Sequence, residues 1–336
     1  MLRVQSFFAA VALLAYVGDV FEPSAPKATI GFQRLRVDDY QGAPIDLAIW
    51  YPSRSRASLH RLGSIVQTVA VNGSVEGRDH PLVIIAPGDG GSFRAHHHTA
   101  LSLAAAGYVV AVPSQSDRTS LPARRPSSLL DRVERISVAI DFMNADWFGA
   151  SAIDADRIGV VGFSIGAVAA LVASGGKPDL RRAGPSCEID RAYSACSRMP
   201  STAGYAPVAR EPLPMPPRDR RIAAAVLVAP TLGFTFSPDG LQHVAVPVQL
   251  WRPEDDVVAP HPWHADLIRQ SLPRPADYHV VANAGHYSFN SPCAEYGSTA
   301  DGACPEAADS TRRDLLDALN KKLTVFLDRE LRAKRG

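Results

Sequence analysis

Eight apolar runs of strand length follow one another along the 336-residue chain. They are, in order, FQRLRVDDY (32–40), IDLAIWYP (45–52), PLVIIAPG (81–88), YVVAVPSQ (108–115), RIGVVGFS (157–164), IAAAVLVAP (222–230), VPVQLWRP (246–253) and YHVVANAG (278–285). The first two alternate apolar with polar residues, whereas the later ones are almost continuously apolar, as strands buried on both faces are. This order predicts a sheet edge followed by a buried, parallel centre.

Helical patterns lie between the later runs and after the last one. Residues 128–146 gather apolar residues on one helix face, and residues 311–336 do the same. Strands that alternate with helices form βαβ units and therefore a mostly parallel sheet. We expect an α/β fold in a single domain over residues 29–336, with a central sheet of about eight strands flanked by helices.

Residues 175–220 break the alternation. This segment is rich in proline, glycine and charged residues, which are typical of irregular structure. We interpret it as a cap-like insertion over the carboxyl edge of the sheet, and not as a second domain.

The first 28 residues have the features of a signal peptide and a linker. Arg3 precedes an eleven-residue apolar run from Phe7 to Val17, which has the length of a signal-peptide core and is short for a membrane span. We expect export to the periplasm or the medium, with cleavage between Gly18 and Ala28 and no stable membrane insertion of the mature chain.

Four cysteines fall into two local pairs. Cys187 and Cys196 are nine positions apart, and Cys293 and Cys304 are eleven apart. Four cysteines permit three connectivities, and in an oxidising compartment these two local pairings would cross-link two loops. Zinc binding is the less favoured alternative because the short C-x-x-C spacing is missing, and free buried thiols remain a third.

The charge of the chain argues against a nucleic-acid partner. Lysine and arginine number 35 and acidic residues 34, which gives a formal net charge of +1 with the two signs interleaved. Nucleic-acid binding requires a concentrated basic surface. A small-molecule partner is favoured instead.

A serine stands between two glycines at the end of the fifth run. Gly162, Phe163, Ser164, Ile165 and Gly166 form a G-x-S-x-G sequence that follows RIGVV and precedes AVAALVAS. A strand, a sharp turn and a helix in this order expose a serine hydroxyl as a nucleophile elbow. The alternative is a small residue that only packs the turn.

A serine nucleophile needs a base and a carboxylate that orients the base. Glu254, Asp255 and Asp256 follow the seventh run, and His286 follows the eighth. The order Ser164, acid, histidine is that of the α/β-hydrolases. A solvated acidic loop and a structural histidine are the alternatives.

Two backbone amides are candidates for an oxyanion hole. One belongs to Ile165, directly after the serine, and the other to Asp89 in the loop PGDGG after an early strand. The glycines of this loop match neither phosphate-binding pattern. The run His96, His97, His98 is a poor metal site, since consecutive helical residues point about 100° apart, so we expect a helix start there.

The combination of motifs resembles the α/β-hydrolases similar to platelet-activating-factor acetylhydrolase and to bacterial predicted dienelactone hydrolases. The resemblance covers most of the mature chain and is carried by GFQRLRVDDYQGAPIDLAIWYPS, PLVIIAPGDGGSFRAHHHTALSLAAAGYVVAVP, GVVGFSIGA, DDVVAP, NAGHYSFNSPC and the final helix. In the family the catalytic acid stands four residues before a proline, which selects Asp256 by its distance from Pro260. The family implies carboxylic ester hydrolysis through an acyl-enzyme, without metal or organic cofactor.

The sequence departs from this family in two places. Relatives usually read H-G-x-G-G where this chain has Pro87 to Gly91, with Asp89 at the oxyanion-donor position. A carboxylate facing an oxyanion would oppose catalysis, so we expect the Asp89 side chain to turn away, toward Arg94 or His96. True dienelactone hydrolases use a cysteine nucleophile, so Ser164 makes dienelactone an unsuitable substrate.

The sequence thus predicts a serine esterase that acts on short-chain or lipid-like acyl esters, with Ser164, His286 and Asp256 as the triad. Four aromatic residues beside the motifs are candidates for an acyl pocket or for the core: Phe163, Tyr287, Phe289 and Trp251. An amidase or peptidase on the same triad and a non-catalytic binding protein on a hydrolase fold are the alternative functions. Nothing in the sequence indicates the oligomeric state.

Overall fold

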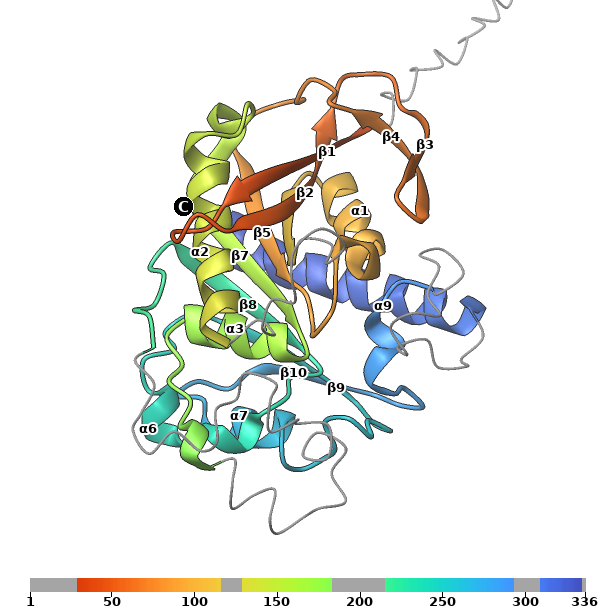
Figure 1. Ribbon diagram of the computed structural model, residues 1–336. Coiled ribbons are helices and arrows are strands. Elements are labelled where there is room, and N and C mark those ends of the chain that lie inside the picture. The colour runs from red at the N-terminus through yellow and green to blue at the C-terminus, as the bar shows by residue number, and fades with distance from the viewer. Residues whose placement is uncertain (1–28, 116–128, 183–214, 293–308, 334–336) are drawn as a thin grey trace, which may run out of the picture.

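The computed structural model describes residues 29–115, 129–182, 215–292 and 309–333, and these form ten strands of one sheet with helices on both faces (Figure 1). The strands are β1 Thr29–Asp38, β2 Pro44–Ser53, β3 Ser58–Leu62, β4 Ile65–Val71, β5 His80–Ala86, β6 Val109–Gln115, β7 Ile153–Phe163, β8 Ile222–Val228, β9 Val248–Pro253 and β10 Asp277–Val281. The α-helices are α1 His97–Ala105, α2 Leu129–Ala145, α3 Ile165–Ala173, α6 Pro238–Leu241, α7 Ala265–Ser271 and α9 Asp309–Leu327, which continues as a π-helical turn over Asp328–Arg332.

The strand order is β10-β9-β8-β7-β5-β6-β2-β1-β4-β3. The six strands from β10 to β6 are mutually parallel, and β2 joins β6 in antiparallel orientation. All eight apolar runs are strands, and the two alternating runs lie outside the parallel centre. The predicted α/β class is confirmed. The two early strands are not the sheet edge, however: β4 and β3 lie beyond them, and β2 is buried over almost its whole length.

The sheet is larger than the expected eight strands because of a hairpin between β2 and β5. Strands β3 and β4 pair in antiparallel register around Gly63, whose φ is +71°. β3 is largely exposed and mostly polar, so it lacks an apolar run. β4 alternates buried and exposed residues over its first five positions and includes polar Gln67 and Thr68, which is a weaker sequence signal than a continuous apolar run.

Two helical layers enclose the sheet and divide the core in two. Helices α2 and α3 contribute Ile136, Ile140 and Val168 to one core cluster, and α1 and α9 contribute Leu103 and Leu323 to the other. Figure 1 shows α2 and α3 on one side of the sheet and α1 and α9 on the other. The helices expected at 128–146 and 311–336 are therefore present, with their apolar faces on the sheet.

The carboxyl ends of the parallel strands all lie at one edge of the sheet. Ligand and catalytic residues of open α/β sheets gather at this edge, on the loops that follow the strands. The loops after β5, β7, β9 and β10 carry Asp89, Ser164, Asp256 and His286 respectively. The topology thus accounts for how residues far apart in the sequence come together.

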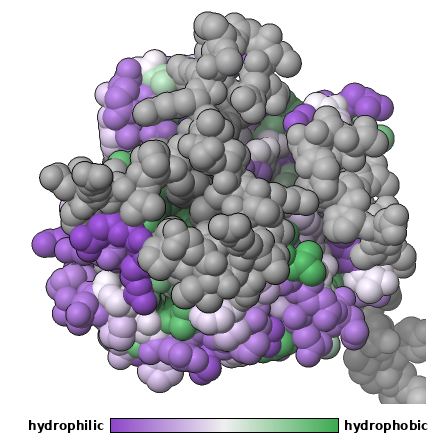
Figure 2. Space-filling model, turned by 60° about the horizontal axis from the view of Figure 1, so that its bottom comes forward, coloured by the Kyte–Doolittle hydropathy of each residue, from purple (hydrophilic) through white to green (hydrophobic). Residues whose placement is uncertain are grey.

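Hydrophilic side chains prevail among the described residues visible in Figure 2, and hydrophobic ones occur singly or in small groups. Within the described ranges, no helix has both the length and the apolar character needed to cross a membrane. Several expectations lie outside the described residues and stay predictions: the signal peptide, the pairing of the four cysteines, and the cap-like insertion at 175–220, of which residues 183–214 are not described.

Candidate active site

Ser164 occupies a sharp turn between β7 and α3. Its backbone angles are φ 57° and ψ −122°, a strained combination that residues other than glycine adopt mainly at functional sites. Its N–H donates to the carbonyl of Val228 at 2.9 Å, which ties the turn to the neighbouring strand β8. The serine is thus held at a strand-to-helix turn with the geometry of a nucleophile elbow.

The two glycines of the motif are required by close backbone approach. A Cβ on Gly162 would lie 2.4 Å from the carbonyl oxygen of Gly166. A Cβ on Gly166 would lie 2.2 Å from the carbonyl oxygen of Ala86 and 2.5 Å from that of Pro87. These neighbours are backbone atoms that cannot rotate away. The G-x-S-x-G sequence is therefore fixed by packing against β5 as well as by the turn.

His286 and Asp256 form a continuous chain of hydrogen bonds with Ser164. The His286 Nε2 lies 2.9 Å from the Ser164 Oγ, and the His286 Nδ1 lies 2.8 Å from the Asp256 Oδ2. All three residues are buried, with 8% of Ser164, 3% of His286 and 5% of Asp256 exposed. The three residues predicted to act together are in hydrogen-bonding contact.

The carboxylate of Asp256 is well provided with donors. Its Oδ1 accepts the N–H groups of Val258 at 2.8 Å and Ala259 at 2.7 Å, while Oδ2 faces His286. A buried carboxylate requires such partners, because an unpaired charge in the interior is costly. Glu254 and Asp255 are exposed. Of the three acidic residues on this loop, Asp256 is the one in contact with the histidine.

Backbone bonds join the acid loop to the histidine loop. The N–H of Glu254 donates to the carbonyl of Val281, and that of Asp255 donates to the carbonyl of Ala284, both at 2.9 Å. His286 then begins a short 3-10 helix, His286–Phe289. The two loops therefore hold Asp256 and His286 in a fixed relative position.

The two amides proposed for an oxyanion hole come from two separate segments next to the serine. Ile165 N–H is at the first position of α3, where helical N–H groups have no intrahelical acceptor. Asp89 follows Gly88, whose added Cβ would lie 3.3 Å from the Ser164 Cβ. Among the described residues, no hydrogen bond uses the N–H of Asp89 or Ile165.

The Asp89 side chain turns to a different cation from those expected. Its Oδ1 lies 2.6 Å from the Arg132 guanidinium of α2, and the carboxylate is 85% exposed. Arg94 instead contacts Ser92 through its Nε, and His96 is buried against Phe163, so neither is the partner of Asp89. The expected partners were wrong because Arg132 reaches the loop from a helix 43 positions away in sequence. No local sequence signal identifies Arg132.

The predicted pocket aromatics differ in their surroundings. Phe163 and half-buried Tyr287 lie beside the histidine, with ring centroids 5.1 Å from that of His286 in both cases. Trp251 is buried, stacks on His279 at 4.2 Å and donates its indole N–H to Gln249. Phe289 is buried in the same core cluster as Trp251. Phe163 belongs to that cluster as well, and Tyr287 packs against it. What distinguishes Phe163 and Tyr287 is their contact with the His286 ring.

Two buried histidines near the site, His96 and His264, are not part of the triad. His96, at the end of the 3-10 turn Phe93–His96, precedes α1 as expected, and burial lowers its pKa to about 4. Burial also lowers the pKa of His264 to about 4, although the nearby Asp256 acts in the opposite direction. The Nδ1 of His264 lies 3.4 Å from the N–H of Gly233. Both rings are thus neutral at pH 7 and add no positive charge beside His286.

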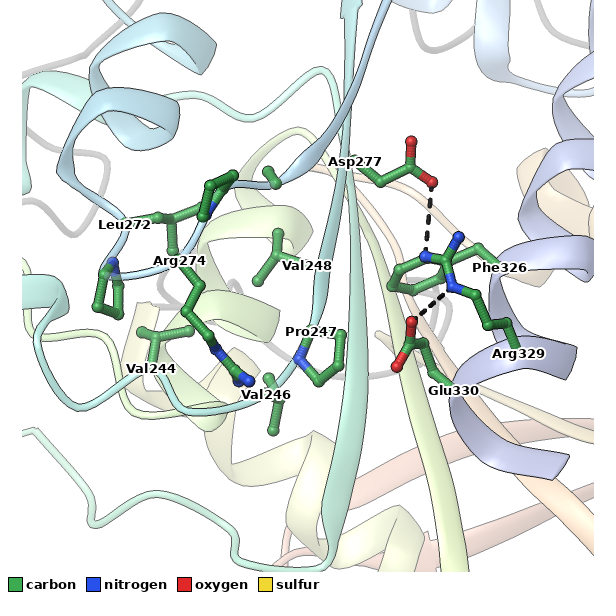
Figure 3. Close-up of a pocket in the computed structure, with 13 residues that line it drawn as sticks. Val244, Val246, Pro247, Val248, Leu272, Arg274, Asp277, Phe326, Arg329 and Glu330 are labelled. Carbon is green, nitrogen blue, oxygen red and sulfur yellow. Dashed lines mark hydrogen bonds and ion pairs between the residues drawn. The ribbon is translucent and has the colours of Figure 1, made fainter. Parts of the chain in front are cut away.

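A cavity of about 380 Å³ lies away from this site, at the amino ends of β9 and β10 (Figure 3). Its charged residues include Arg329, which lies 4.0 Å from Asp277 and 2.7 Å from Glu330. Ser164 and its partners follow the carboxyl ends of their strands, at the other end of the sheet. This cavity is therefore separate from the candidate active site.

Comparisons with known proteins agree with this architecture at the level of fold. No protein-family model and no curated protein matches the chain. Among solved structures, it is similar to a ferulic acid esterase from Streptomyces cinnamoneus, with a TM-score of 0.61, 17% identity and coverage of 94% of each chain. The chain has an α/β-hydrolase fold. At this identity the likeness concerns the fold, and the resemblance to platelet-activating-factor acetylhydrolase stays a prediction from the sequence.

Proposed function

We propose that the protein is a serine carboxylic-ester hydrolase. The observation that carries the proposal is the hydrogen-bond chain from Asp256 through His286 to Ser164 on a nucleophile elbow. A serine hydroxyl alone is a weak nucleophile, and a histidine held by a carboxylate activates it by removing its proton. The similarity in fold to a ferulic acid esterase is consistent with ester chemistry.

The reaction would proceed in two halves. Ser164 Oγ attacks the ester carbonyl while His286 Nε2 takes its proton, and the negative charge moves to the carbonyl oxygen. Collapse of this tetrahedral intermediate breaks the bond to the alcohol, which leaves with the proton from His286. Water then attacks the acyl-enzyme with the same base, and the acid is released as Ser164 regains its proton.

The amides of Asp89 and Ile165 would stabilise the oxyanion in both halves. Each is free of other hydrogen bonds among the described residues. The Ile165 N–H also lies at the N-terminus of α3, where the helix dipole favours negative charge. Fixed donors of this kind usually contribute a large share of the catalysis of acyl transfer.

Apolar groups near the triad support a short-chain or lipid-like acyl ester as the substrate class. Phe163 and Tyr287 contact the ring of His286. Val257, directly after Asp256, is 75% exposed, and Trp263 on the same loop is 42% exposed. Such groups would accept an apolar acyl or aryl part more readily than a charged one.

Hydrolysis of a panel of esters tests the proposal. The wild-type protein should cleave p-nitrophenyl esters, and profiling over acyl lengths from acetyl to dodecanoyl, with ethyl ferulate as an aryl ester, should reveal the preferred class. Ser164→Ala should abolish this activity. If matched amides were cleaved faster than the esters, the chain would be an amidase. If Ser164→Ala hydrolysed esters at the wild-type rate, the triad would have no catalytic role.

Export is a separate part of the proposal and rests on the sequence of residues 1–28. Mass spectrometry of the secreted protein should find a new N-terminus between Gly18 and Ala28. Peptide mapping without reduction should find Cys187 joined to Cys196 and Cys293 joined to Cys304. An intact Met1 in a cytosolic fraction would contradict export.

A further inference from the structure

An arginine on α2 contacts the loop that carries the proposed oxyanion donor. Arg132 donates from one guanidinium nitrogen to the Gly88 carbonyl at 3.2 Å and from another to the Asp89 carboxylate at 2.6 Å. Its side chain is only 10% exposed, while that of Asp89 is 85% exposed. Arg132 therefore reaches the loop from the protein side, and it contacts the backbone as well as the carboxylate.

We propose that Arg132 is a positioning residue, which orients the peptide between Gly88 and Asp89 so that the Asp89 N–H faces the reacting carbonyl. This inference rests on the proposed esterase function. The Asp89 carboxylate would serve as the second anchor of the guanidinium and would take no part in the chemistry.

Hydrogen bonds to its carbonyl fix the plane of that peptide. The Gly88 carbonyl accepts from Arg132 and also from the N–H of Gly91 at 3.1 Å, so two donors fix its direction. In a trans peptide the carbonyl and the following N–H point in opposite directions. Because the carbonyl faces Arg132, the Asp89 N–H points away from α2.

The backbone of this loop lies close to the nucleophile. A Cβ added to Gly88 would lie 2.9 Å from the Phe163 ring and 3.3 Å from the Ser164 Cβ. The loop backbone therefore passes directly over the elbow. An N–H that leaves this peptide opposite to Arg132 is available to a substrate oxygen bound at Ser164.

The choice of arginine fits this role. A guanidinium presents several donors in a rigid fork, and here it uses separate nitrogens for a carbonyl and for a carboxylate. A lysine offers one flexible ammonium, which cannot fix two acceptors with the same geometry. The ion pair itself adds little stability because Asp89 is mostly exposed. Its effect is expected in catalysis more than in folding.

The test compares Arg132→Met with wild type in p-nitrophenyl ester hydrolysis. Methionine keeps an apolar stem but removes both donors. Loss of one oxyanion donor costs about 100- to 1000-fold, and a mispositioned donor should cost about 10- to 100-fold in kcat. KM should stay within about twofold, because the donor binds the transition state more strongly than the substrate.

Binding of a transition-state mimic separates positioning from a general structural defect. A trifluoromethyl ketone forms a tetrahedral adduct with the serine, so its Ki should rise in Arg132→Met by about the factor by which kcat/KM falls. Arg132→Lys should fall between wild type and Arg132→Met. Asp89→Ala should lower kcat by less than about tenfold. In the double variant, the losses in kcat from Asp89→Ala and Arg132→Met should not add, since the two residues share one contact.

Arg221→Met is the matched control. Arg221 also pairs with a carboxylate of α2, Asp141 at 2.6 Å, and with Asp219, but these contacts lie outside the loop at residues 87–91. The Arg221→Met substitution should lower the thermal stability of the protein but leave kcat and the Ki of the transition-state mimic unchanged.

The outcomes separate this inference from the proposed function. If hydrolysis depends on Ser164 but Arg132→Met keeps the wild-type kcat and Ki, the positioning role is overturned and the proposed esterase function stands. Absence of Ser164-dependent hydrolysis in the wild type overturns both. If Arg132→Met does not fold, Arg132→Lys decides, because a wild-type kcat in that variant also overturns the role.

Discussion

Asp256 and His286 are joined by a 2.8 Å contact between Oδ2 and Nδ1, with 1% and 2% of their side chains exposed. The two residues come from the loops after β9 and β10, which are neighbouring parallel strands. With the other carboxylate oxygen occupied by two backbone N–H groups, Oδ2 is left to accept a hydrogen bond from the imidazole Nδ1–H. This arrangement selects the tautomer in which Nε2 is the acceptor for the serine hydroxyl.

Asp256→Asn should lower kcat by about 1000- to 10,000-fold without unfolding the protein. The amide oxygen can still accept from Val258 and Ala259, so its NH₂ group is left facing Nδ1. Nδ1 must then accept, which places the proton on Nε2 and removes the base. Steady-state kinetics check this, and Asp255→Asn, at an exposed position on the same loop, is the control that should stay within about twofold. Equal activity of the two variants would contradict the assignment of the acid.

Gly166→Ala should destabilise the protein by about 1–3 kcal/mol, because the new Cβ would meet the carbonyl oxygens of Ala86 and Pro87. Urea unfolding of the purified variant measures this cost. Gly42→Ala is the control: its φ is +77° and nothing lies within 4 Å of the added Cβ, so only backbone strain of about 1 kcal/mol is expected. A smaller loss for Gly166→Ala than for Gly42→Ala would show that the turn does not pack on β5 as described.

Because His96 is buried, the free energy of unfolding should decrease as the pH falls from about 6.5 to about 4. Burial lowers the pKa of His96 from 6.5 to about 4, so in this window the unfolded chain takes up a proton that the folded ring does not. The loss for this one residue is on the order of 2–3 kcal/mol, and buried His97 and His264 act in the same direction.

The variant His96→Leu tests this linkage. Its free energy of unfolding, measured by urea titration at pH 7 and pH 5, should decrease less between the two values than that of the wild type. The imidazole Nε2 has no hydrogen-bond partner among the described residues, so leucine removes the titration without removing such a bond. Parallel pH profiles for the two proteins would contradict a buried, neutral His96.

The residues predicted from sequence are those marked by a local pattern. Ser164 stands in a strand–turn–helix context, and His286 directly follows an apolar strand, so chain order and α/β topology were enough to bring both to one edge of the sheet. Selecting Asp256 among three acidic neighbours required the resemblance to a family, and the contact with His286 now makes the same selection.

The features that sequence did not reveal depend on contacts between distant segments. Arg132 and Arg135 are both charged residues in the same helical pattern, and nothing in the sequence indicates which of them reaches the loop at Asp89. The β3–β4 hairpin was missed because β3 is largely exposed and polar residues interrupt the apolar residues of β4. Trp251 stands beside a motif in the sequence just as Tyr287 does, yet its position within strand β9 gives it core contacts.

Labelling with a fluorophosphonate tests the central claim most directly, because this reagent phosphonylates a serine only when a neighbouring base activates it. We expect one adduct per chain on the peptide that contains Ser164, identified by mass spectrometry, and none in Ser164→Ala or after prior denaturation. We also expect strongly slowed labelling in His286→Ala. An unlabelled Ser164 in folded, wild-type protein, or equal labelling in Ser164→Ala, would contradict the account.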